Sequence, residues 1–120
     1  IPNSIKIKSA FNLFNVSWED FICLFETFDL FKNSKINKLS GGERRLIETY
    51  IILKSDREII LLDEPFSHLA PLYVEKIKVL ISQEKNNKAI IITDHMYRHI
   101  VDVSDDMYLI KNGIQNLSIT

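Results

Sequence analysis

The chain has 120 residues, 46% of them hydrophobic, and a formal net charge of -1. This length suits one small domain and is too short for two. A near-neutral chain without a cluster of lysine and arginine lacks the attraction that drives non-specific nucleic-acid binding, and no apolar run is long enough to span a bilayer. The single cysteine, Cys23, has no partner for an internal disulfide, which favours a reducing, cytoplasmic setting.

The first part of the chain is rich in phenylalanine and predicts two short amphipathic helices. The first helix is expected at residues 8–14. The second has Ser17 as its N-cap, and apolar residues follow at helical spacing: Phe21, Leu24, Phe25 and Phe28. These side chains predict a packed core or a docking face. Residues 33–38 are expected to form a polar connector.

A longer helix and a strand are predicted next. Residues 41–54 predict a helix that follows Ser40, and its inward side is expected to carry Leu46, Ile47, Tyr50 and Leu53. Residues 59–62 form a continuous apolar run, the pattern of a strand that is buried on both faces. Pro71 fits the first turn of a helix that reaches about residue 85, with Val74, Ile77, Leu80 and Ile81 inward.

The last part of the chain continues the alternation of strand and helix. A second buried strand is expected at residues 89–92, and a short helix at residues 96–103. Residues 108–110 and 114–119 flank Asn112-Gly113, a dipeptide that is typical of a type I′ hairpin turn. This alternation predicts an α/β fold with mainly parallel strands.

Residues 39–43, LSGGE, are the most informative stretch. Ser40 and Glu43 have the spacing of a capping box, which predicts the start of a helix. That spacing does not explain Gly41 and Gly42, because a glycine in a helix costs up to ~1 kcal/mol relative to alanine. A backbone that approaches a ligand closely would explain them, and a helix N-terminus with a serine hydroxyl suits phosphate. The residues alone leave phosphate binding and a plain helix start open.

Two adjacent carboxylates, Asp63 and Glu64, follow the first apolar run. Stability explains such a pair poorly, because like charges side by side repel each other. The C-terminal ends of parallel strands are where ligands bind in open α/β sheets. One carboxylate suits Mg²⁺, and the other suits a general base that polarises water. The alternative is a capped turn between a strand and a helix.

Residues 39–45 resemble the signature motif of ABC-type ATPases, and residues 59–66 resemble the Walker B strand of that family at a suitable spacing. Further along, Ser67, His68 and Leu69 occupy the place of the D-loop. Ala70 stands where the family usually has an aspartate that helps to join two subunits, which puts their communication in doubt.

His95, in the run Thr93-Asp94-His95, resembles the histidine of the family's H-loop. A lone histidine after a strand is usually a cap or a solvent-facing residue, and its position alone favours that interpretation. Residues 94–98 are closest to the D-H-x-x-R form found in ATPases for lipopolysaccharide export and branched-chain amino-acid import. His99 has no counterpart in the motif, and a structural role is expected for it.

The resemblance implies a fold and a set of roles. Residues 39–120 would be part of a P-loop NTPase (RecA-like) core, and residues 1–38 part of the α-helical subdomain, together one incomplete nucleotide-binding domain. Asp63 would hold Mg²⁺, directly or through water. Glu64 would be the catalytic base, and His95 would contact the γ-phosphate of ATP. The residues implied to bind nucleotide on a second ABC ATPase subunit are Ser40, Gly41, Gly42 and Glu43.

Some expected motifs are missing. The only glycines are Gly41, Gly42 and Gly113, so no P-loop can be written with this sequence. No glutamine precedes Ser40, where the family's glutamine loop would stand. We therefore expect a portion of a longer protein that binds ATP weakly and does not hydrolyse it alone. Because the family's P-loop strand lies beside residues 89–92, we also expect an exposed strand edge and self-association.

The leading hypothesis is the ATP-hydrolysing subunit of an ABC transporter. Such a subunit would be cytoplasmic and peripheral at the inner face of the membrane, held there by permease subunits that dock on the helical region. One alternative is the C-terminal lobe of a split ABC ATPase for chromosome maintenance or DNA repair. The charge and the lack of sustained heptads speak against that alternative and against a nucleic-acid partner. A non-catalytic interaction module is the other alternative.

Overall fold

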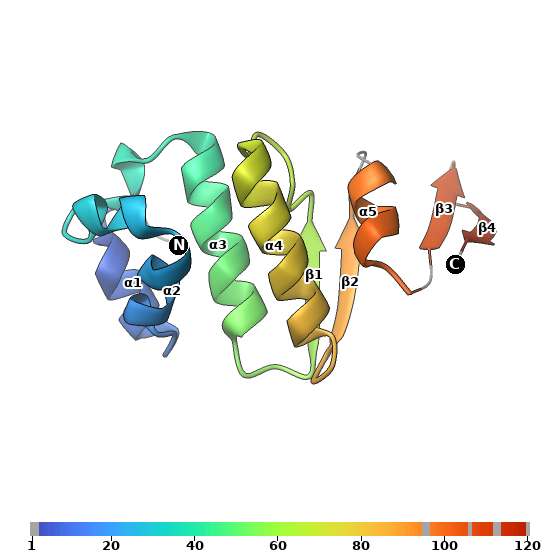
Figure 1. Cartoon of the computed structure of the whole chain (residues 1–120), viewed down its shortest axis with the longest axis horizontal. Coiled ribbons are helices and arrows are strands. Elements are labelled where there is room, and N and C mark those ends of the chain that lie inside the picture. The colour runs from blue at the N-terminus through green and yellow to red at the C-terminus, as the bar shows by residue number, and fades with distance from the viewer. Residues whose placement is uncertain (1–2, 95–96, 106, 112–113, 120) are drawn as a thin grey trace.

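The computed structural model of the chain describes residues 3–94, 97–105, 107–111 and 114–119. Helices α3 (Gly41–Lys54) and α4 (Pro71–Glu84) stand side by side in the middle of the molecule (Figure 1). The N-terminal helical elements lie on one side of this pair. The parallel strands β1 (Ile59–Asp63) and β2 (Ala89–Thr93) lie on the other side. The predicted α/β arrangement with parallel strands is confirmed.

The N-terminal region contains two short α-helices, α1 (Ile7–Leu13) and α2 (Trp18–Leu24). Two 3₁₀ helices follow, η1 (Glu26–Phe31) and η2 (Ile36–Lys38). The Ser17 hydroxyl accepts a hydrogen bond of 3.1 Å from the Asp20 N–H, so Ser17 is the N-cap of α2, as predicted.

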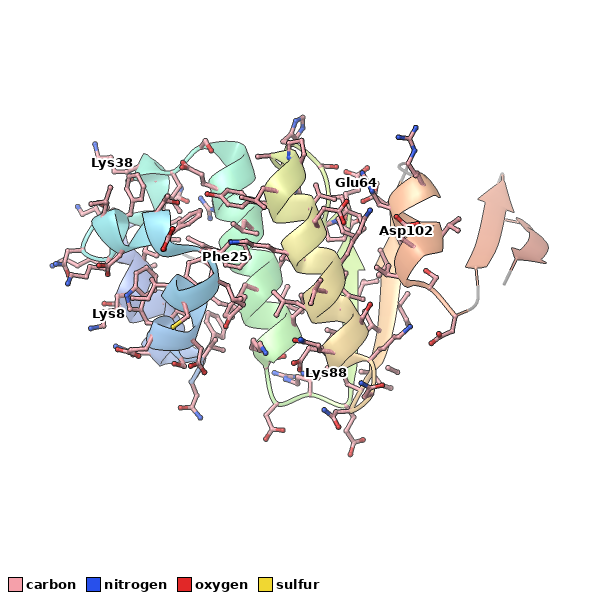
Figure 2. All side chains as sticks on the ribbon, in the orientation of Figure 1. Lys8, Phe25, Lys38, Glu64, Lys88 and Asp102 are labelled. Atoms are coloured by element: carbon pink, nitrogen blue, oxygen red, sulfur yellow. The ribbon has the colours of Figure 1, made fainter. Side chains whose placement is uncertain are left out.

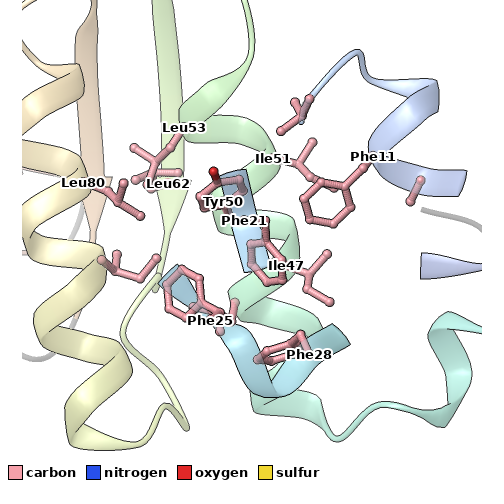
Figure 3. Close-up of a cluster of buried hydrophobic side chains, with 14 of the residues drawn as sticks. Phe11, Phe21, Phe25, Phe28, Ile47, Tyr50, Ile51, Leu53, Leu62 and Leu80 are labelled. Carbon is pink, nitrogen blue, oxygen red and sulfur yellow. The ribbon is translucent and has the colours of Figure 1, made fainter. Parts of the chain in front are cut away.

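Aromatic side chains join these short helices to α3. Figure 3 shows these rings, and Phe21 contacts each of the others: Phe11, Phe25, Phe28 and Tyr50 of α3. The ring centroids of Phe21 and Tyr50 are 4.9 Å apart with a steep interplanar angle of 68°, an edge-to-face contact. The predicted aromatic face is therefore a packed core in this structure.

Two expectations for this region were wrong. Leu24 is 38% exposed, because α2 ends there and the chain continues as a 3₁₀ helix that brings Phe28 to the core instead. The expected polar connector contains Ile36, which is fully buried. The Ile36 N–H donates to the Ile5 carbonyl (3.0 Å), so this segment packs against the start of the chain.

Helix α3 begins where the sequence predicts, because Ser40 and Glu43 form a complete capping box. The Glu43 N–H donates to the Ser40 hydroxyl (3.1 Å), and the Ser40 N–H donates to the Glu43 carboxylate (2.8 Å). The helix ends at Lys54, as predicted. The side chains expected to face inward are all buried: Leu46, Ile47, Tyr50 and Leu53.

Strands β1 and β2 pair in parallel, with Ile59 opposite Ala89 and Asp63 opposite Thr93. Alternate residues of β1 join the buried cluster that also contains the inward side chains of α3 and α4. The residues between them are open: Ile59 is 68% exposed and Leu61 57%, and on β2 Ile91 is 55% exposed. The prediction of strands buried on both faces was therefore wrong. Within the described residues, helices cover only one face of this sheet, and an apolar run cannot distinguish one covered face from two.

Helix α4 begins with Pro71 in its first turn and buries its predicted face: Val74, Ile77, Leu80 and Ile81. Helix α5 (Tyr97–Val103) packs on α4, and an ion pair of 2.8 Å joins Lys78 of α4 to Asp102 of α5. Strands β3 (Met107–Lys111) and β4 (Ile114–Ile119) pair in antiparallel fashion, as predicted, in a separate two-stranded sheet. The residues predicted for its turn, 112–113, lie outside the described residues.

Candidate functional site

Two of the predicted motifs meet at one end of the molecule. Helix α3 begins at the same end at which β1 finishes, and Glu64 lies at this end (Figures 1 and 2). The chain thus brings the signature residues 40–43 and the acidic pair to one edge of the α/β layer. This edge is where ligands bind in sheets of this type.

The signature segment lies at the N-terminus of a long helix. Ser40 is the N-cap of α3, and Gly41 and Gly42 are its first two residues. The first N–H groups of a helix have no intrahelical acceptor, and they carry the positive end of the helix dipole. The backbone of Gly41 and Gly42 can therefore offer hydrogen bonds to an anion such as phosphate.

The two glycines stand in different surroundings. A β-carbon on Gly42 would lie 2.3 Å from the carbonyl oxygen of His68, too close for any side chain. A β-carbon on Gly41 would meet no atom within 4 Å. From the sequence, close approach to a ligand was a possible reason for both glycines, with phosphate binding and a plain helix start left open. For Gly42 the fold itself supplies a sufficient reason, whereas for Gly41 the fold supplies none.

An open hollow of about 280 Å³ lies between the signature turn and the D-loop. The φ of His68, 61°, lies in the left-handed region, and the carbonyl group of His68 lies against Gly42 at the start of α3. The hollow is lined by Ser40, Gly42, Glu43, His68, Leu69, Ala70 and Tyr73.

The acidic pair stands where β1 ends. The Asp63 carboxylate is exposed and accepts a hydrogen bond from the Thr93 hydroxyl on the paired strand. The Glu64 N–H donates to the Thr93 carbonyl (2.6 Å), and Glu64 has a φ of 49° in the left-handed region. Glu64 is half-buried. The sequence did not single out Thr93 as a partner, but the strand register places it opposite Asp63.

Arg45 links the signature helix to the acidic pair. Its Nη1 donates to the carbonyl oxygens of Asp63 (3.0 Å) and Glu64 (3.2 Å). Sequence reasoning counted Arg45 only as part of the signature resemblance. The available signal was its place one turn into a helix that starts beside the strand end. The distance between two segments that are far apart in the chain could not be read from the sequence.

The loops after the strands are only partly described. The Ser67 N–H donates to the Glu64 carbonyl (3.2 Å), and Leu69 packs against the buried core. The Phe66 N–H donates to the Asp94 carboxylate (3.4 Å), which connects the loops that follow β1 and β2. His95, the predicted H-loop residue, lies outside the described residues. His99 packs its ring on Phe66, at 5.3 Å between centroids, which fits the structural role expected for it.

The donors at the strand end suit Mg²⁺. An exposed carboxylate beside a hydroxyl, Asp63 with Thr93, offers hard oxygen ligands. Among the described residues, no three side chains of His, Cys, Asp or Glu gather around one point. No described helix has the length and apolar character needed to cross a membrane.

No family model matches the sequence. Individual proteins, however, are similar to it in sequence. The chain is 41% identical over 76 residues to the lipopolysaccharide export system ATP-binding protein LptB of Haemophilus influenzae, covering 62% of this chain and 32% of that protein. It is 36% identical over 93 residues to the protein of the same name from Escherichia coli K12, covering 75% of this chain and 39% of the relative.

A solved structure supports the same fold. The ATP binding subunit of an ABC transporter superimposes with a TM-score of 0.81 at 17% identity, over 100% of this chain and 55% of that one. The chain accordingly has the fold of part of an ATP-binding cassette, an α/β P-loop NTPase fold. It is similar in sequence to ATP-binding proteins of ABC transporters and spans about a third of the length of the curated relatives that it matches.

Proposed function

We propose that the chain is part of the ATP-hydrolysing subunit of an ABC transporter, in which hydrolysis powers transport across a membrane. The observation that supports this proposal most directly is the meeting of two motifs at one edge. The first turn of α3 carries the signature residues, the end of β1 carries Asp63 and Glu64, and Arg45 hydrogen-bonds the two together.

The signature turn would act on a nucleotide held by a second subunit. The N–H groups of Gly41 and Gly42 have no intrahelical acceptor, and the Ser40 hydroxyl, which accepts from the Glu43 N–H, can still donate its own proton; these groups suit the γ-phosphate of ATP. Glu43 closes the capping box and so fixes the orientation of this turn. In the same dimer the D-loop residues, Ser67 to Leu69, would face the opposite subunit.

The acidic pair would serve the nucleotide of its own subunit. Mg²⁺, when bound, neutralises charge on the phosphate oxygens, and Asp63 would hold it directly or through water. Glu64 would accept a proton from the attacking water, a role worth ~10²–10⁴ in rate. His95 would contact the γ-phosphate from the loop after β2.

The chain alone should bind ATP weakly and should not hydrolyse it. A P-loop supplies the backbone amides and the lysine that cradle the phosphates, and no such loop can be written with three glycines at positions 41, 42 and 113. The remaining groups touch only the γ-phosphate and the metal. Isothermal titration calorimetry with and without Mg²⁺ should detect no micromolar ATP site on the chain.

A permease and a membrane location belong to the same proposal. The helical region exposes apolar side chains, among them Leu13 (63%) and Leu30 (86%), which suit contact with transmembrane subunits. The protein would then sit at the cytoplasmic face of the membrane. The split ABC ATPase for DNA work is less favoured, because the net charge is -1 and the relatives bear the name of an export system.

The proposal can be tested with a chimera. The segment of the E. coli relative that precedes its matching region, which would supply a P-loop, is joined ahead of residue 1. We expect the chimera to hydrolyse ATP, and Glu64→Gln to lower kcat by ~10²–10⁴. The control is Glu58→Gln, an exposed carboxylate at the opposite end of β1. A folded chimera that does not hydrolyse ATP, or full activity of Glu64→Gln, would count against the proposal.

A further inference from the structure

Glu64 has a backbone conformation that a non-glycine residue rarely adopts. Its φ is 49°, in the left-handed region, where the β-carbon crowds the backbone. Such a conformation persists only where surrounding contacts fix it, and it occurs most often at functional sites. The contacts that fix Glu64 therefore indicate which residues set the position of its carboxylate.

Three hydrogen bonds hold the Glu64 backbone. Its N–H donates to the Thr93 carbonyl (2.6 Å), which ties it to β2. Its carbonyl accepts from the Ser67 N–H (3.2 Å), within the same turn, and from the Arg45 Nη1 (3.2 Å). Among these partners, Thr93, Ser67 and Arg45, only Arg45 belongs to α3, the helix that begins with the signature residues.

The bond from Arg45 has features of a positioning contact. One Nη1 nitrogen serves two successive carbonyls, those of Asp63 and Glu64, at 3.0 and 3.2 Å. Hydrogen bonds from a guanidinium are charge-assisted and stronger than those between neutral groups. Arg45 is also half-buried, so solvent competes with it less than it would at an open surface.

We infer that Arg45 is a positioning residue that sets the backbone of the acidic pair from the first turns of α3. The importance of Glu64 in this inference rests on the proposed function. Because Ser40, Gly41 and Arg45 belong to one continuous helix start, a shift of the signature turn moves the groups that hold Glu64. Arg45 thus links the signature turn, which the chain would offer to the nucleotide of a second subunit, to the acidic pair, which would serve the nucleotide of its own subunit.

The test measures the Glu64 backbone directly, in the full 120-residue chain, by nuclear magnetic resonance. The intraresidue nuclear Overhauser effect between the amide and α protons reports a positive φ at Glu64, because this conformation brings the two protons unusually close together. Arg45→Gln removes the charged fork, so we expect this effect to weaken and the amide shift of Glu64 to move toward ordinary values. Arg45→Lys retains a cation that can reach the carbonyls, and it should restore most of the wild-type signal.

Arg44→Gln is the matched control. Arg44 is the neighbouring arginine of α3, and it contacts Glu48 (3.7 Å) and Asn3 on the helical side of the molecule. This variant should leave the amide–α effect at Glu64 unchanged. An unchanged effect in Arg45→Gln, or an equal change in both variants, would overturn the inference.

A measurement on the wild-type chain covers the case in which Arg45→Gln does not fold. The Nη1 protons of Arg45 should exchange with water more slowly than the guanidinium protons of Arg57, an exposed arginine in the segment before β1, because two carbonyls hold them. Equal exchange rates would also overturn the inference. Neither measurement needs nucleotide, so an inactive chimera would contradict the proposed function and leave the role of Arg45 intact.

Discussion

The carbonyl oxygen of His68 lies 2.3 Å from the point at which a β-carbon on Gly42 would stand. Only glycine fits at this contact between the first turn of α3 and the D-loop. A β-carbon on Gly41, one residue earlier, would stand in open space. The two glycines of the signature segment are therefore separable: one is required by the fold, and the other is available to a ligand.

Substitution of each glycine by alanine should separate these roles. Gly42→Ala should lower the free energy of unfolding by about 2 kcal/mol, because the methyl group must displace the backbone of His68. Gly41→Ala should leave it unchanged or raise it by up to about 1 kcal/mol, because alanine restricts the unfolded chain. Urea denaturation of both variants measures the difference.

The role of Gly41 can also be tested by ATP hydrolysis in the chimera that carries the preceding segment of the E. coli relative. If Gly41 lies against the γ-phosphate, Gly41→Ala should reduce ATP hydrolysis while the protein remains as stable as the wild type. A Gly41→Ala chimera with normal activity would remove Gly41 from the proposed nucleotide site. A Gly42→Ala chain with unchanged stability would contradict the close contact with His68.

Sequence reasoning succeeded where a local rule determines the structure. The start of α3 was predictable from Ser40 and Glu43, and the start of α4 from Pro71, because capping and proline geometry depend only on neighbouring residues. Sequence reasoning failed where burial or a contact depends on a segment that is far away in the chain. The exposure of Leu61 depends on what covers the second sheet face, and the bond from Arg45 to the strand end depends on how α3 packs on β1.

Lys88 stabilises the other end of the layer, where α3, α4 and β2 converge (Figure 2). Its ammonium donates to the carbonyls of Leu53 and Ser55, at 2.7 Å each, and pairs with Glu84 at 3.2 Å. Its side chain is only 8% exposed. Lys88→Met should lower the free energy of unfolding by about 3 kcal/mol, because it leaves two carbonyls at the end of α3 without their cation and leaves Lys54 as the remaining partner of the shielded Glu84 carboxylate.

Lys85→Met is the control for this measurement. Lys85 lies one turn earlier and pairs with Asp105, whose side chain is 78% exposed. Exposed pairs contribute little, so this variant should change the stability by less than about 1 kcal/mol. Equal losses in the two variants, measured by urea denaturation under the same conditions, would contradict the role given to Lys88.

Tyr50 should make the protein sensitive to alkali. Burial raises the pKa of Tyr50 from 10.0 to about 12, and the charges of Asp20 and Glu84 add to the shift. Because the folded pKa lies above the unfolded one, this contribution to stability is intact below pH 10 and is lost as the pH rises to about 12. Tyr50→Phe removes the titration, so its urea midpoint should fall less steeply over this range.

Deprotonation of Lys78 should also lower the stability in alkali, so its effect must be separated from that of Tyr50. Its hydrogen bond to Asp102 raises the pKa of Lys78, so its contribution is also lost in alkali. The variant Lys78→Met should keep the part of the alkaline loss that Tyr50 causes. If Tyr50→Phe and the wild type show the same slope between pH 10 and about pH 12, the burial of the phenol is not the cause.

The open face of the β1–β2 sheet should drive self-association. Ile59, Leu61 and Ile91 expose more than half of their surface on this face, and within the described residues β2 hydrogen-bonds to no strand except β1. An apolar face with an unpaired edge recruits further chains. Light scattering should therefore detect oligomers whose mass rises with concentration.

Ile91→Lys should shift these oligomers toward the monomer, because a buried charge at the contact is unfavourable. Val79→Lys is the matched control, since Val79 is 56% exposed but lies on α4, away from the sheet. A monodisperse wild-type monomer at high concentration would contradict the prediction, and an equal effect of both lysines would place the contact elsewhere.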